Sequence, residues 1–349
     1  MTDVITVDPD NPDPVIITRA ANCLRGGGLV AFPTETVYGL GAHALDRAAV
    51  ARLFEAKGRP ATDPLIVHVT ALADAAPFVA RMPELAHRLA SRFWPGPLTL
   101  VFFRTPIVPT EVTAGLDTVA LRAPAHPVAR ALLEATRLPI AAPSANLFSR
   151  PSPTRAAHVL EDLDGRIDML LDAGPTRVGV ESTVLDLTQN PPIVLRPGAV
   201  TLEELRTVIP NVASRAVTPA PSGATPSPGL FPRHYAPRTP MTLYEGDPAV
   251  TRERLQAAVR DALAAGRRVG VLATEEQAQI VRELPVVVAE LGSERDASAV
   301  AARLYAALRD LDAAQLDLII APDLPHEDGL WRALRDRLRR AAAHVIQAR

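Results

Sequence analysis

One lysine stands among 37 basic residues, and its neighbours could bind phosphate. Lys57 is followed by Gly58, Arg59 and Pro60, so the sequence places two cations close together. A compact ammonium and a planar guanidinium are not interchangeable, so a chain that otherwise uses arginine keeps a lysine either where the difference matters or by chance. Glycine and proline end the preceding helical pattern and fix the loop, which aims both cations the same way. The pair could neutralise a triphosphate, although cations at a helix C-terminus also stabilise the helix dipole.

Polar side chains also follow several short apolar runs, where a strand would end. Five segments have this pattern: residues 33–41, 143–146, 149–154, 179–184 and 195–198. Each segment alone is typical of a turn or a helix cap. Together they supply hydroxyl, amide and guanidinium groups, but no paired nucleophile and base. This inventory favours a reaction driven by positioning and charge neutralisation, such as an attack on a phosphate.

The common catalytic and nucleotide-binding motifs are missing from the sequence. It has no Walker-type Gly-x-x-x-x-Gly-Lys-Ser/Thr, no Gly-x-Ser-x-Gly, no His-Glu-x-x-His and no cluster of cysteine and histidine. Residues 39–44 match the loose dinucleotide fingerprint Gly-x-Gly-x-x-Ala. The acidic residue expected about 20 positions later is missing, and Arg59 lies there instead, so this fingerprint is a weak signal.

The composition is that of a globular protein with two domains. Its 349 residues are 48% hydrophobic and 22% charged, with a net charge of -2. The near-neutral charge argues against nucleic-acid binding over the whole surface, although a local basic cleft remains compatible with it. Cys23 is the only cysteine, so no intrachain disulfide can form and the reducing cytosol is the expected compartment. Because the sequence shows neither a signal peptide nor a long apolar run, we expect a cytoplasmic protein.

The first 210 residues must position the polar segments, and their pattern alternates between short apolar runs and amphipathic stretches. This alternation predicts an α/β domain with a twisted mixed sheet and helices. Strands are expected at residues 29–32, 65–69, 98–103, 119–121, 140–142, 169–171, 184–187 and 193–195. Helices are expected at residues 14–24, 46–57, 83–93, 127–136, 154–163 and 202–208.

The remainder of the chain predicts a linker and a second domain. Residues 213–240 contain seven prolines, which indicates an extended segment, and residues 228–237 add two aromatic rings and two cations that a spacer would not need. From residue 241 onward, strands and helices alternate strictly, which predicts a smaller Rossmann-like α/β domain. Its closing helix is expected at residues 329–345. The expected domains are residues 1–212, a linker at 213–240 and residues 241–349.

The ordered set of polar segments resembles the YrdC family of threonylcarbamoyl-AMP synthases. The resemblance rests on Pro-Thr-Glu-Thr-Val-Tyr-Gly-Leu-Gly at 33–41, Lys-Gly-Arg-Pro at 57–60, Pro-Ser-Ala-Asn at 143–146, Glu-Ser-Thr at 181–183 and Arg-Pro-Gly at 196–198. Arg-His-Tyr-Ala-Pro at 233–237 and the domain after it are similar to the longer, two-domain form. The resemblance covers essentially the whole chain.

The resemblance implies a nucleotidyltransferase with a YrdC-like catalytic domain. Such an enzyme converts L-threonine, bicarbonate and ATP into L-threonylcarbamoyl-AMP and pyrophosphate. The product serves the threonylcarbamoyl modification of the adenosine beside the anticodon in certain tRNAs. The protein supplies no nucleophile, because a carbamate formed from threonine attacks the α-phosphate.

The resemblance also implies roles for individual residues. Lys57 and Arg59 would be the catalytic cations that neutralise the triphosphate, with Mg²⁺ as the expected companion of ATP. The residues expected to bind L-threonine are Thr36, His68, Arg122, Ser144 and Ser182, with Arg122 as the natural partner of the threonine carboxylate. The residues expected to contact ATP are Lys57, Arg59, Asp63, Thr118, Asn146, Thr154, Arg196 and Tyr235.

Three of these positions leave alternatives open. Asp63 departs from the family pattern Pro-x-x-Asn-Pro-Leu, and a carboxylate there repels phosphate unless it contacts a ribose hydroxyl, a metal or a donor. Ser152 competes with Thr154 for the nucleotide, since both lie in one short run. His68 lies within an apolar strand, where a core histidine with satisfied hydrogen bonds is an equally good explanation.

Two segments beyond the catalytic domain have further interpretations. Tyr235 could merely anchor the linker, or the linker could fold over the nucleotide as a lid that keeps water from the labile product. The closing helix is rich in arginine and could contact tRNA or the proteins that receive the product, although a solvated helical face is the simpler explanation. Its arginines are Arg332, Arg335, Arg337, Arg339 and Arg340.

Two other classes of function compete with the synthase. A non-catalytic RNA-binding module of the same fold would bind RNA tightly and turn over no ATP, but the near-neutral charge and the threonine-like pocket count against it. A carbamoyl-transferring maturation factor would use carbamoyl phosphate. Such proteins add zinc-finger and acylphosphatase segments that this sequence lacks.

Overall fold

The computed structural model describes residues 1–214 and 223–348, and it divides into two compact units. The first unit contains Met1–Phe148 and Ser152–Phe231, and the second contains Ser149–Pro151 and Pro232–Arg349. Residues 215–222, which belong to the predicted linker, lie outside the described residues. Within the described ranges, no helix is long and apolar enough to cross a membrane.

The first unit is built on an 11-stranded sheet in which parallel and antiparallel pairs are mixed, so the predicted mixed sheet is confirmed. The strand order is β1-β8-β2-β3-β7-β4-β6-β5-β9-β10-β11. The strands are β1 Asp3–Thr6, β2 Val30–Phe32, β3 Gly39–His43, β4 Ile66–His68, β5 Leu98–Phe103, β6 Thr118–Arg122, β7 Ile140–Ala141, β8 Met169–Asp172, β9 Thr183–Asp186, β10 Ile193–Arg196 and β11 Ala213–Ser214.

Helices connect these strands, and local sequence signals set their ends. The helix α2 begins after Asp46, whose side chain accepts hydrogen bonds from the next backbone N–H groups, and it ends at Gly58, which has a positive φ of 59°. Lys57 is therefore the last residue of the helix. The helices of this unit are α1 Pro14–Arg25, α2 Arg47–Lys57, α3 Leu72–Ala75, α4 Glu84–Phe93, α5 Thr110–Thr113, α6 Pro127–Thr136, α7 Ala156–Leu163 and α8 Leu202–Arg206.

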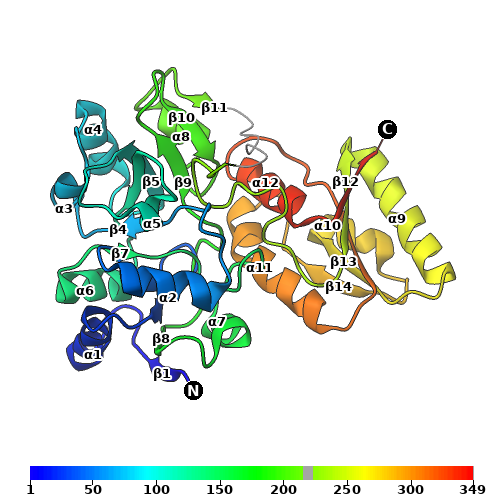
Figure 1. The fold of residues 1–349 in the computed structure, drawn as a ribbon. Helices are drawn as coiled ribbons and strands as arrows, with labels where there is room; N and C mark the ends of the chain where they lie inside the picture. Colours follow the sequence, from blue (N-terminus) through cyan, green and yellow to red (C-terminus); the bar gives the residue numbers. More distant parts are fainter. Residues whose placement is uncertain (215–222, 349) are drawn as a thin grey trace. The chain divides into compact units, whose positions relative to one another are not determined.

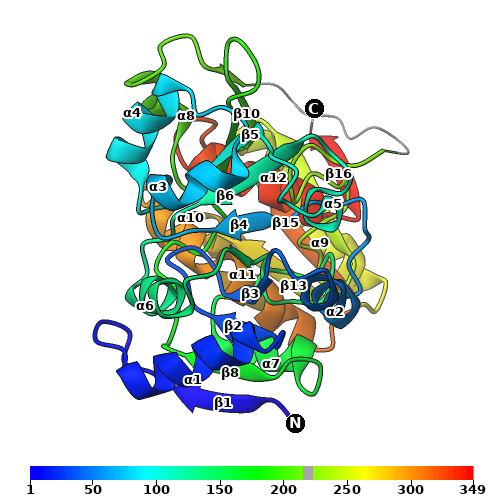
Figure 2. The same cartoon turned by 60° about the vertical axis from the view of Figure 1, so that its left-hand side comes forward.

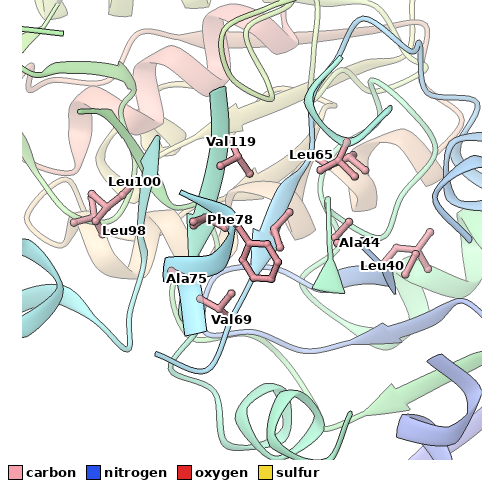
Figure 3. Close-up of a cluster of buried hydrophobic side chains, with 14 of the residues drawn as sticks. Leu40, Ala44, Leu65, Val69, Ala75, Phe78, Leu98, Leu100 and Val119 are labelled. Carbon is pink, nitrogen blue, oxygen red and sulfur yellow. The ribbon is translucent and has the colours of Figure 1, made fainter. Parts of the chain in front are cut away.

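The two faces of this sheet are covered differently. One face carries the largest buried cluster, which includes Leu40, Ala44, Leu65, Val69, Ala75, Phe78, Leu98, Leu100 and Val119 (Figure 3). On the opposite face, α1 packs beside α6 (Figure 2), and together they cover apolar side chains of β8, β2 and β7. The part of this second face that lies on β4, β6, β5 and β9 carries the polar residues described below.

The second unit is a five-stranded, fully parallel sheet in the order β14-β13-β15-β12-β16, so the predicted Rossmann-like domain is confirmed. The strands are β12 Met241–Gly246, β13 Val269–Ala273, β14 Val287–Glu290, β15 Leu318–Pro322 and β16 His344–Ala348. The helices are α9 Pro248–Ala264, α10 Glu275–Ala278, α11 Ala297–Ala313 and α12 Trp331–Ala341. Figure 1 shows α9 on one side of this sheet and α11 and α12 on the other.

Several sequence predictions need correction. The closing helix ends at Ala341 instead of residue 345, because His344–Ala348 forms β16, whose β-branched residues pair in parallel with β12. Asp3–Thr6 forms a strand that was not predicted. The helix expected from residue 154 begins at Ala156. Residues 213–214, expected in the linker, form the short strand β11.

The loose glycine fingerprint is not a nucleotide-binding turn. Gly39 and Gly41 lie inside β3, which pairs antiparallel with β2, whereas the glycines of a dinucleotide site form the turn between a parallel strand and the next helix. A Cβ on Gly41 would come within 2.9 Å of the Phe32 ring, so close packing between neighbouring strands explains this glycine.

Candidate active site on one face of the first sheet

The register of β4 and β6 brings two predicted site residues together. His68 and Arg122 are direct partners at the last positions of these parallel strands. Side chains alternate along a strand, so Arg122 shares its face with Ala120 and Thr118, while the side chains between them enter the large core. Thr118, His68 and Arg122 therefore belong to the face opposite the large core. Ser182 directly precedes β9 and is two residues from Val184 of that same face, so alternation places it there as well.

A small apolar cluster forms the floor of this face. It consists of the buried side chains Ile66, Val101, Ala120, Val184 and Leu195. They come from five adjacent strands, so the floor is continuous across this part of the sheet. Polar groups around such a floor interact in a medium of low dielectric constant, which strengthens their hydrogen bonds and charge interactions.

Arg122 is held in one orientation beside this floor. Its Nε donates to the carbonyl of Gly96 at 3.2 Å, and its Nη2 donates to Oε1 of Glu35 at 2.6 Å and to Oγ1 of Thr36 at 3.1 Å. Oε2 of Glu35 accepts a hydrogen bond from the backbone of Ala125 at 3.0 Å. The prediction placed Thr36 and Arg122 in one subsite, and they are in direct contact. It missed Glu35, although this carboxylate lies inside the quoted 33–41 segment.

Ser182 belongs to a second polar group on the same face. Its Oγ lies 2.8 Å from Oγ1 of Thr99, and it accepts a hydrogen bond from Nη2 of Arg196 at 3.2 Å. Arg196 also donates to the carbonyl of Ser182. Predicted threonine-binding and nucleotide-binding residues therefore touch each other here. Thr99 was not predicted, since a threonine within an apolar run carries no recognisable signal.

Gly198 allows the backbone to close behind Ser182. A Cβ at this position would lie 2.4 Å from both the carbonyl oxygen of Glu181 and the backbone nitrogen of Thr183. No side chain can be accommodated at such distances, because the obstructing atoms are backbone. The glycine of the Arg-Pro-Gly segment thus serves a close approach of two chain segments.

Lys57 is fully buried, and its ammonium points at backbone carbonyls. Its Nζ donates to the carbonyls of Ser144 and Asn146 at 2.5 and 2.6 Å, and the side chain is 1% exposed. Burial lowers the pKa of Lys57 well below its usual value, and the positive charge of Arg59 acts in the same direction. The structure thus brings three predicted residues together, and it shows that Lys57 also determines the position of the Ser144–Asn146 turn.

Asp63 is neutralised by a donor and a cation. Its Oδ1 accepts a hydrogen bond from Oγ1 of Thr225 at 3.2 Å, and its Oδ2 forms an ion pair with Nη2 of Arg59 at 2.9 Å. Burial raises the pKa of Asp63, while Arg59 and the Thr225 hydroxyl oppose that effect. Arg59 also donates to the backbone carbonyls of Asp63 and Pro64. The carboxylate that departs from the family pattern therefore pairs with the predicted phosphate-binding arginine.

The end of the proline-rich segment packs on predicted nucleotide-binding residues of its own unit. Besides the Thr225–Asp63 bond, the carbonyl of Pro228 accepts a hydrogen bond from Nη1 of Arg196 at 3.1 Å. The ring of Phe231 lies edge-on to that of Phe148, with centroids 5.4 Å apart. These contacts attach residues 225–231 to the region where ATP is expected.

His68 is not a core histidine with satisfied hydrogen bonds. It is 2% exposed, and within residues 1–214 and 223–348 neither ring nitrogen has a hydrogen-bond partner. The Phe32 ring packs against it in an edge arrangement at 6.5 Å. Burial, with the neighbouring charge of Arg122, lowers the pKa of His68 to about 3, against a smaller opposing effect of the backbone at Ile66 and Ile140. A neutral imidazole with free nitrogens is suited to bind a ligand.

The Ser152 and Thr154 alternatives have different surroundings. Oγ of Ser152 donates to Oε1 of Glu181 at 2.6 Å. Glu181 directly precedes Ser182 in the sequence. The backbone of Thr154 donates to Nδ1 of His158 at 3.3 Å. Both residues are buried.

Tyr235 belongs to the second unit, where its ring is enclosed. Its centroid lies 5.6 Å from that of Tyr305 and 4.2 Å from that of His234, and the guanidinium of Arg337 lies 5.1 Å over its face. Its φ is 59°, an uncommon conformation for a bulky residue that the surrounding contacts hold in place. These contacts fix the position of the Tyr235 ring within this unit.

The arginine-rich helix α12 is largely neutralised by its own unit. Arg335 pairs with Asp323 and Glu327, Arg339 with Glu245, and both Arg337 and Arg340 with Asp336. The expectation of a solvated arginine face is wrong for Arg337, which is completely buried. Charges that are offset in this way contribute little to nucleic-acid binding.

The described residues contain no group of three or more histidine, cysteine or acidic side chains arranged to hold a metal ion. The acidic residues of the candidate site already have partners. Glu35 pairs with Arg122, Asp63 with Arg59, and Glu181 accepts from Ser152. Magnesium is commonly bound through substrate phosphates and water with only one or two carboxylates, so this residue set fits a metal that arrives with ATP.

Comparisons with known proteins identify the family of the chain. Residues 22–198 match the Sua5_yciO_yrdC family, described as "Telomere recombination", and residues 200–343 match a family described as "Threonylcarbamoyl-AMP synthase, C-terminal domain". The chain is 45% identical to threonylcarbamoyl-AMP synthase from Pyrococcus abyssi over 332 residues, which cover 95% of each chain. It is also 45% identical to the Bacillus subtilis protein of the same name, covering 97% of this chain and 96% of that one.

A solved structure is similar over the full length. The crystal structure of P. abyssi Sua5 complexed with L-threonine has a TM-score of 0.93 and 43% sequence identity, and the match covers 100% of both chains. Both domains, their order and their folds are therefore shared with that protein. The chain belongs to the threonylcarbamoyl-AMP synthase family, in its two-domain Sua5 form.

Proposed function

We propose that the chain synthesises L-threonylcarbamoyl-AMP from L-threonine, bicarbonate and ATP on the sheet face that holds Arg122 and Ser182. Membership of the family makes it a nucleotidyltransferase with ATP as a substrate. The observation that carries the placement is Arg122, a buried guanidinium held by Gly96, Glu35 and Thr36 beside an apolar floor. Such a fixed arginine is a carboxylate-binding group.

The threonine subsite uses the groups nearest to Arg122. The guanidinium binds the threonine carboxylate, and Thr36, which contacts it, and His68, its partner in the strand register, add hydrogen-bonding groups. His68 supports this role because its two ring nitrogens have no partner among residues 1–214 and 223–348. Ser182 completes the polar rim, and Ser144 is positioned by Lys57.

The nucleotide subsite uses the cations that lie near the proline-rich segment. Lys57 and Arg59 are each other's electrostatic neighbours, and their combined charge favours the triphosphate. Arg196 and Asp63 each hold one part of the 225–231 segment. Thr118, Asn146, Thr154 and Tyr235 remain proposed nucleotide contacts on the basis of the family resemblance, with Ser152 as the alternative to Thr154.

The chemistry requires positioning more than a protein nucleophile. The threonine amine and bicarbonate give a carbamate with loss of water. A carbamate oxygen attacks the α-phosphorus of ATP, the bond from that phosphorus to the bridging oxygen breaks, and pyrophosphate leaves. Fixed cations offset the charge that develops, and the apolar floor limits access of water to the reactive product. Mg²⁺ would accompany ATP and would offset part of the phosphate charge beside Lys57 and Arg59.

Residues 225–231 act as a cover for the nucleotide, in agreement with the proposed lid. The support is that this segment contacts Asp63, Arg196 and Phe148, all within the first unit. Replacement of Phe231 by alanine should shorten the lifetime of the product and leave the fold intact. If both the rate and the product lifetime were unchanged in Phe231→Ala, this segment would not be a lid.

The activity can be tested by measuring pyrophosphate release while each substrate is omitted in turn. We expect release only when L-threonine, bicarbonate and ATP are all present, with threonylcarbamoyl-AMP detected by mass spectrometry. ATP cleavage that is indifferent to threonine would refute the synthase. Turnover that needs carbamoyl phosphate would indicate the carbamoyl-transferring class, and tight RNA binding without turnover would indicate the RNA-binding class.

The cellular role follows from the product. A labile acyl-adenylate must be consumed quickly, so the chain should work near tRNA and the transferase that uses the adenylate. The single cysteine of the chain supports a reducing, cytoplasmic setting. Transfer of the threonylcarbamoyl group to tRNA in a reconstituted system would test this role.

A further inference from the structure

Glu35 is a buried carboxylate that contacts the threonine subsite. Its side chain is 6% exposed, and its oxygens have separate partners. Oε1 accepts from Nη2 of Arg122 at 2.6 Å, and Oε2 accepts from the backbone of Ala125 at 3.0 Å. The backbone of Glu35 is also fixed, because its carbonyl accepts a hydrogen bond from Val178 at 2.9 Å. The carboxylate is thus held at both ends.

These contacts leave one side of the Arg122 guanidinium available. Nε is occupied by the carbonyl of Gly96, and Nη2 by Glu35 and Thr36. Nη1 has no hydrogen-bond partner among residues 1–214 and 223–348. A planar guanidinium whose other nitrogens are fixed can turn no further, so the direction of its last two N–H bonds is determined.

Charge adds a second effect. A buried arginine without a counterion would attract any anion, including bicarbonate and phosphate, and would be costly to bury. With Glu35 in place, the pair has no net charge, and what remains is a directional donor. A zwitterionic amino acid, which is itself neutral overall, fits such a site better than an anion does.

We infer that Glu35 is a positioning residue, which aims Nη1 of Arg122 at the α-carboxylate of the amino acid substrate and keeps the subsite neutral. This role rests on the proposed function, since Arg122 is taken as the carboxylate partner. Glu35 itself does not take part in the reaction. A carboxylate that served only to stabilise the fold would affect the binding of every ligand through loss of folded protein, whereas Glu35 affects one subsite.

The variant Glu35→Gln tests the role, because glutamine preserves size and a hydrogen-bond acceptor. We expect the KM for L-threonine to rise about tenfold or more, as for the loss of a charge-assisted hydrogen bond, while the KM for ATP changes less than about twofold. The matched control is Glu111→Gln, which breaks the exposed Arg47–Glu111 pair, with an N···O distance of 2.9 Å. The control should leave both constants unchanged.

Ligand binding to the full chain distinguishes positioning from general damage. Calorimetry with L-threonine and with L-threoninamide, which lacks the carboxylate, gives two affinities for each protein. Glu35→Gln should weaken L-threonine binding more than the already weaker binding of threoninamide, a cation that loses only its attraction to the Glu35 charge. Equal weakening of both ligands, or unchanged threonine affinity in a folded variant, would overturn the inference.

A double-mutant cycle covers the case in which Glu35→Gln folds poorly. Glu35→Asp keeps the charge but withdraws it by one methylene, and it should raise the threonine KM less than Glu35→Gln does. In an Arg122→Lys background, either change should add less than about twofold, because the two residues act together. Additive effects would contradict the inference.

If the wild-type chain released no threonine-dependent pyrophosphate, the proposed function would fail instead. The calorimetric result would still test the role of Glu35.

Discussion

Two buried cations of the first unit, Lys57 and Arg122, are held by opposite kinds of partner. Lys57 donates to two backbone carbonyls, which carry no net charge, whereas Arg122 pairs with the carboxylate of Glu35. The lysine charge therefore remains uncompensated by its direct partners, and burial lowers its pKa well below the usual value. The charge of Arg122 is balanced by Glu35, so what Arg122 offers a ligand is the fixed direction of its free N–H groups.

The difference suggests how one site handles two unlike substrates. A triphosphate carries several negative charges, so it is suited to an ammonium that is not already neutralised. An amino acid is neutral overall, so it needs orientation more than charge. The partner of each buried cation is therefore more informative than the cation itself. On this basis, changes at Lys57 should lower the catalytic rate, and changes at Arg122 should raise the threonine KM.

The largest effect is expected for Lys57→Arg. The bulkier guanidinium has no room in a position that is 1% exposed, so the Ser144–Asn146 turn must shift. Since a displacement of about 1 Å at an active site can cost on the order of 100-fold, we expect kcat to fall by about that factor. Circular dichroism and steady-state pyrophosphate release provide the measurements. The matched control is Arg104→Lys, the converse exchange at a cation that also holds two backbone carbonyls. Near-normal turnover of Lys57→Arg would show that the lysine is not required.

A smaller and different effect is expected for Arg122→Lys. Lysine keeps the charge but lacks the fork that contacts Gly96, Glu35 and Thr36 together, so the threonine carboxylate loses its directed partner. We expect the threonine KM to rise by roughly ten- to 100-fold, the cost of about 1.5–3 kcal/mol for a charged hydrogen bond, while kcat at saturation changes little. Initial rates over a range of threonine concentrations measure this KM, with Arg47→Lys, at an exposed arginine, as the control. A fall in kcat alone would remove the contrast with Lys57.

Asp63→Asn sharpens the comparison through a third buried cation. Arg59 is partly neutralised by Asp63, and an asparagine would keep the Thr225 bond while removing the negative charge near the triphosphate. We expect the KM for ATP to decrease, by a few-fold on the scale of about 1 kcal/mol for a screened charge pair. Titration of ATP at saturating threonine gives the result. An increase in the KM for ATP would mean that the carboxylate contacts the ribose or the metal.

The stability of the fold at acidic pH should depend on His68, which stays neutral beside Arg122. The pKa of His68 is lowered to about 3 by burial, from 6.5 for an ordinary histidine. Between these values the unfolded chain binds a proton that the folded chain does not, so stability is complete above about pH 6.5 and decreases as the pH falls. The free energy of unfolding should lose up to about 1.4 kcal/mol per pH unit from this group. His68→Gln should remove that slope.

Urea unfolding between pH 4 and 7 can compare this variant with the wild type. His87→Gln, at an exposed position of α4, is the control and should keep the wild-type slope. If the curves of His68→Gln and the wild type ran parallel, protonation of His68 would not be linked to folding.

The motifs in the sequence supplied most residues of the candidate site, but not how its parts are connected. The Lys-Gly-Arg-Pro and Pro-Ser-Ala-Asn segments were both recognised, whereas the contact of Lys57 with the carbonyls of Ser144 and Asn146 depends on strand pairing far apart in the chain. Glu35 was visible between two threonines and was not assigned, because an acidic residue next to an expected anionic substrate appears unfavourable until its arginine is seen. Thr99 carried no signal at all.

The fold was predicted where local periodicity decides the structure. Both α/β units and most central strands were found, since apolar runs of this kind are local signals. The strand β16 was missed because Ala341–Ala343 continues the helical composition, and only pairing with β12 gives His344–Ala348 an extended conformation. The order of strands in the 11-stranded sheet likewise depends on long-range pairing, which no local pattern encodes.

Gly198 has a consequence for the interpretation of genetic variation. Because a methyl group there would meet the backbone of Glu181 and Thr183 at 2.4 Å, even alanine should be rejected. In a saturation scan the position would score with the substrate-binding residues, although it has no side chain to touch a substrate. A loss-of-function allele at this glycine would indicate a misplaced Ser182. Raising the supply of threonine or ATP should not rescue it, because neither restores the backbone.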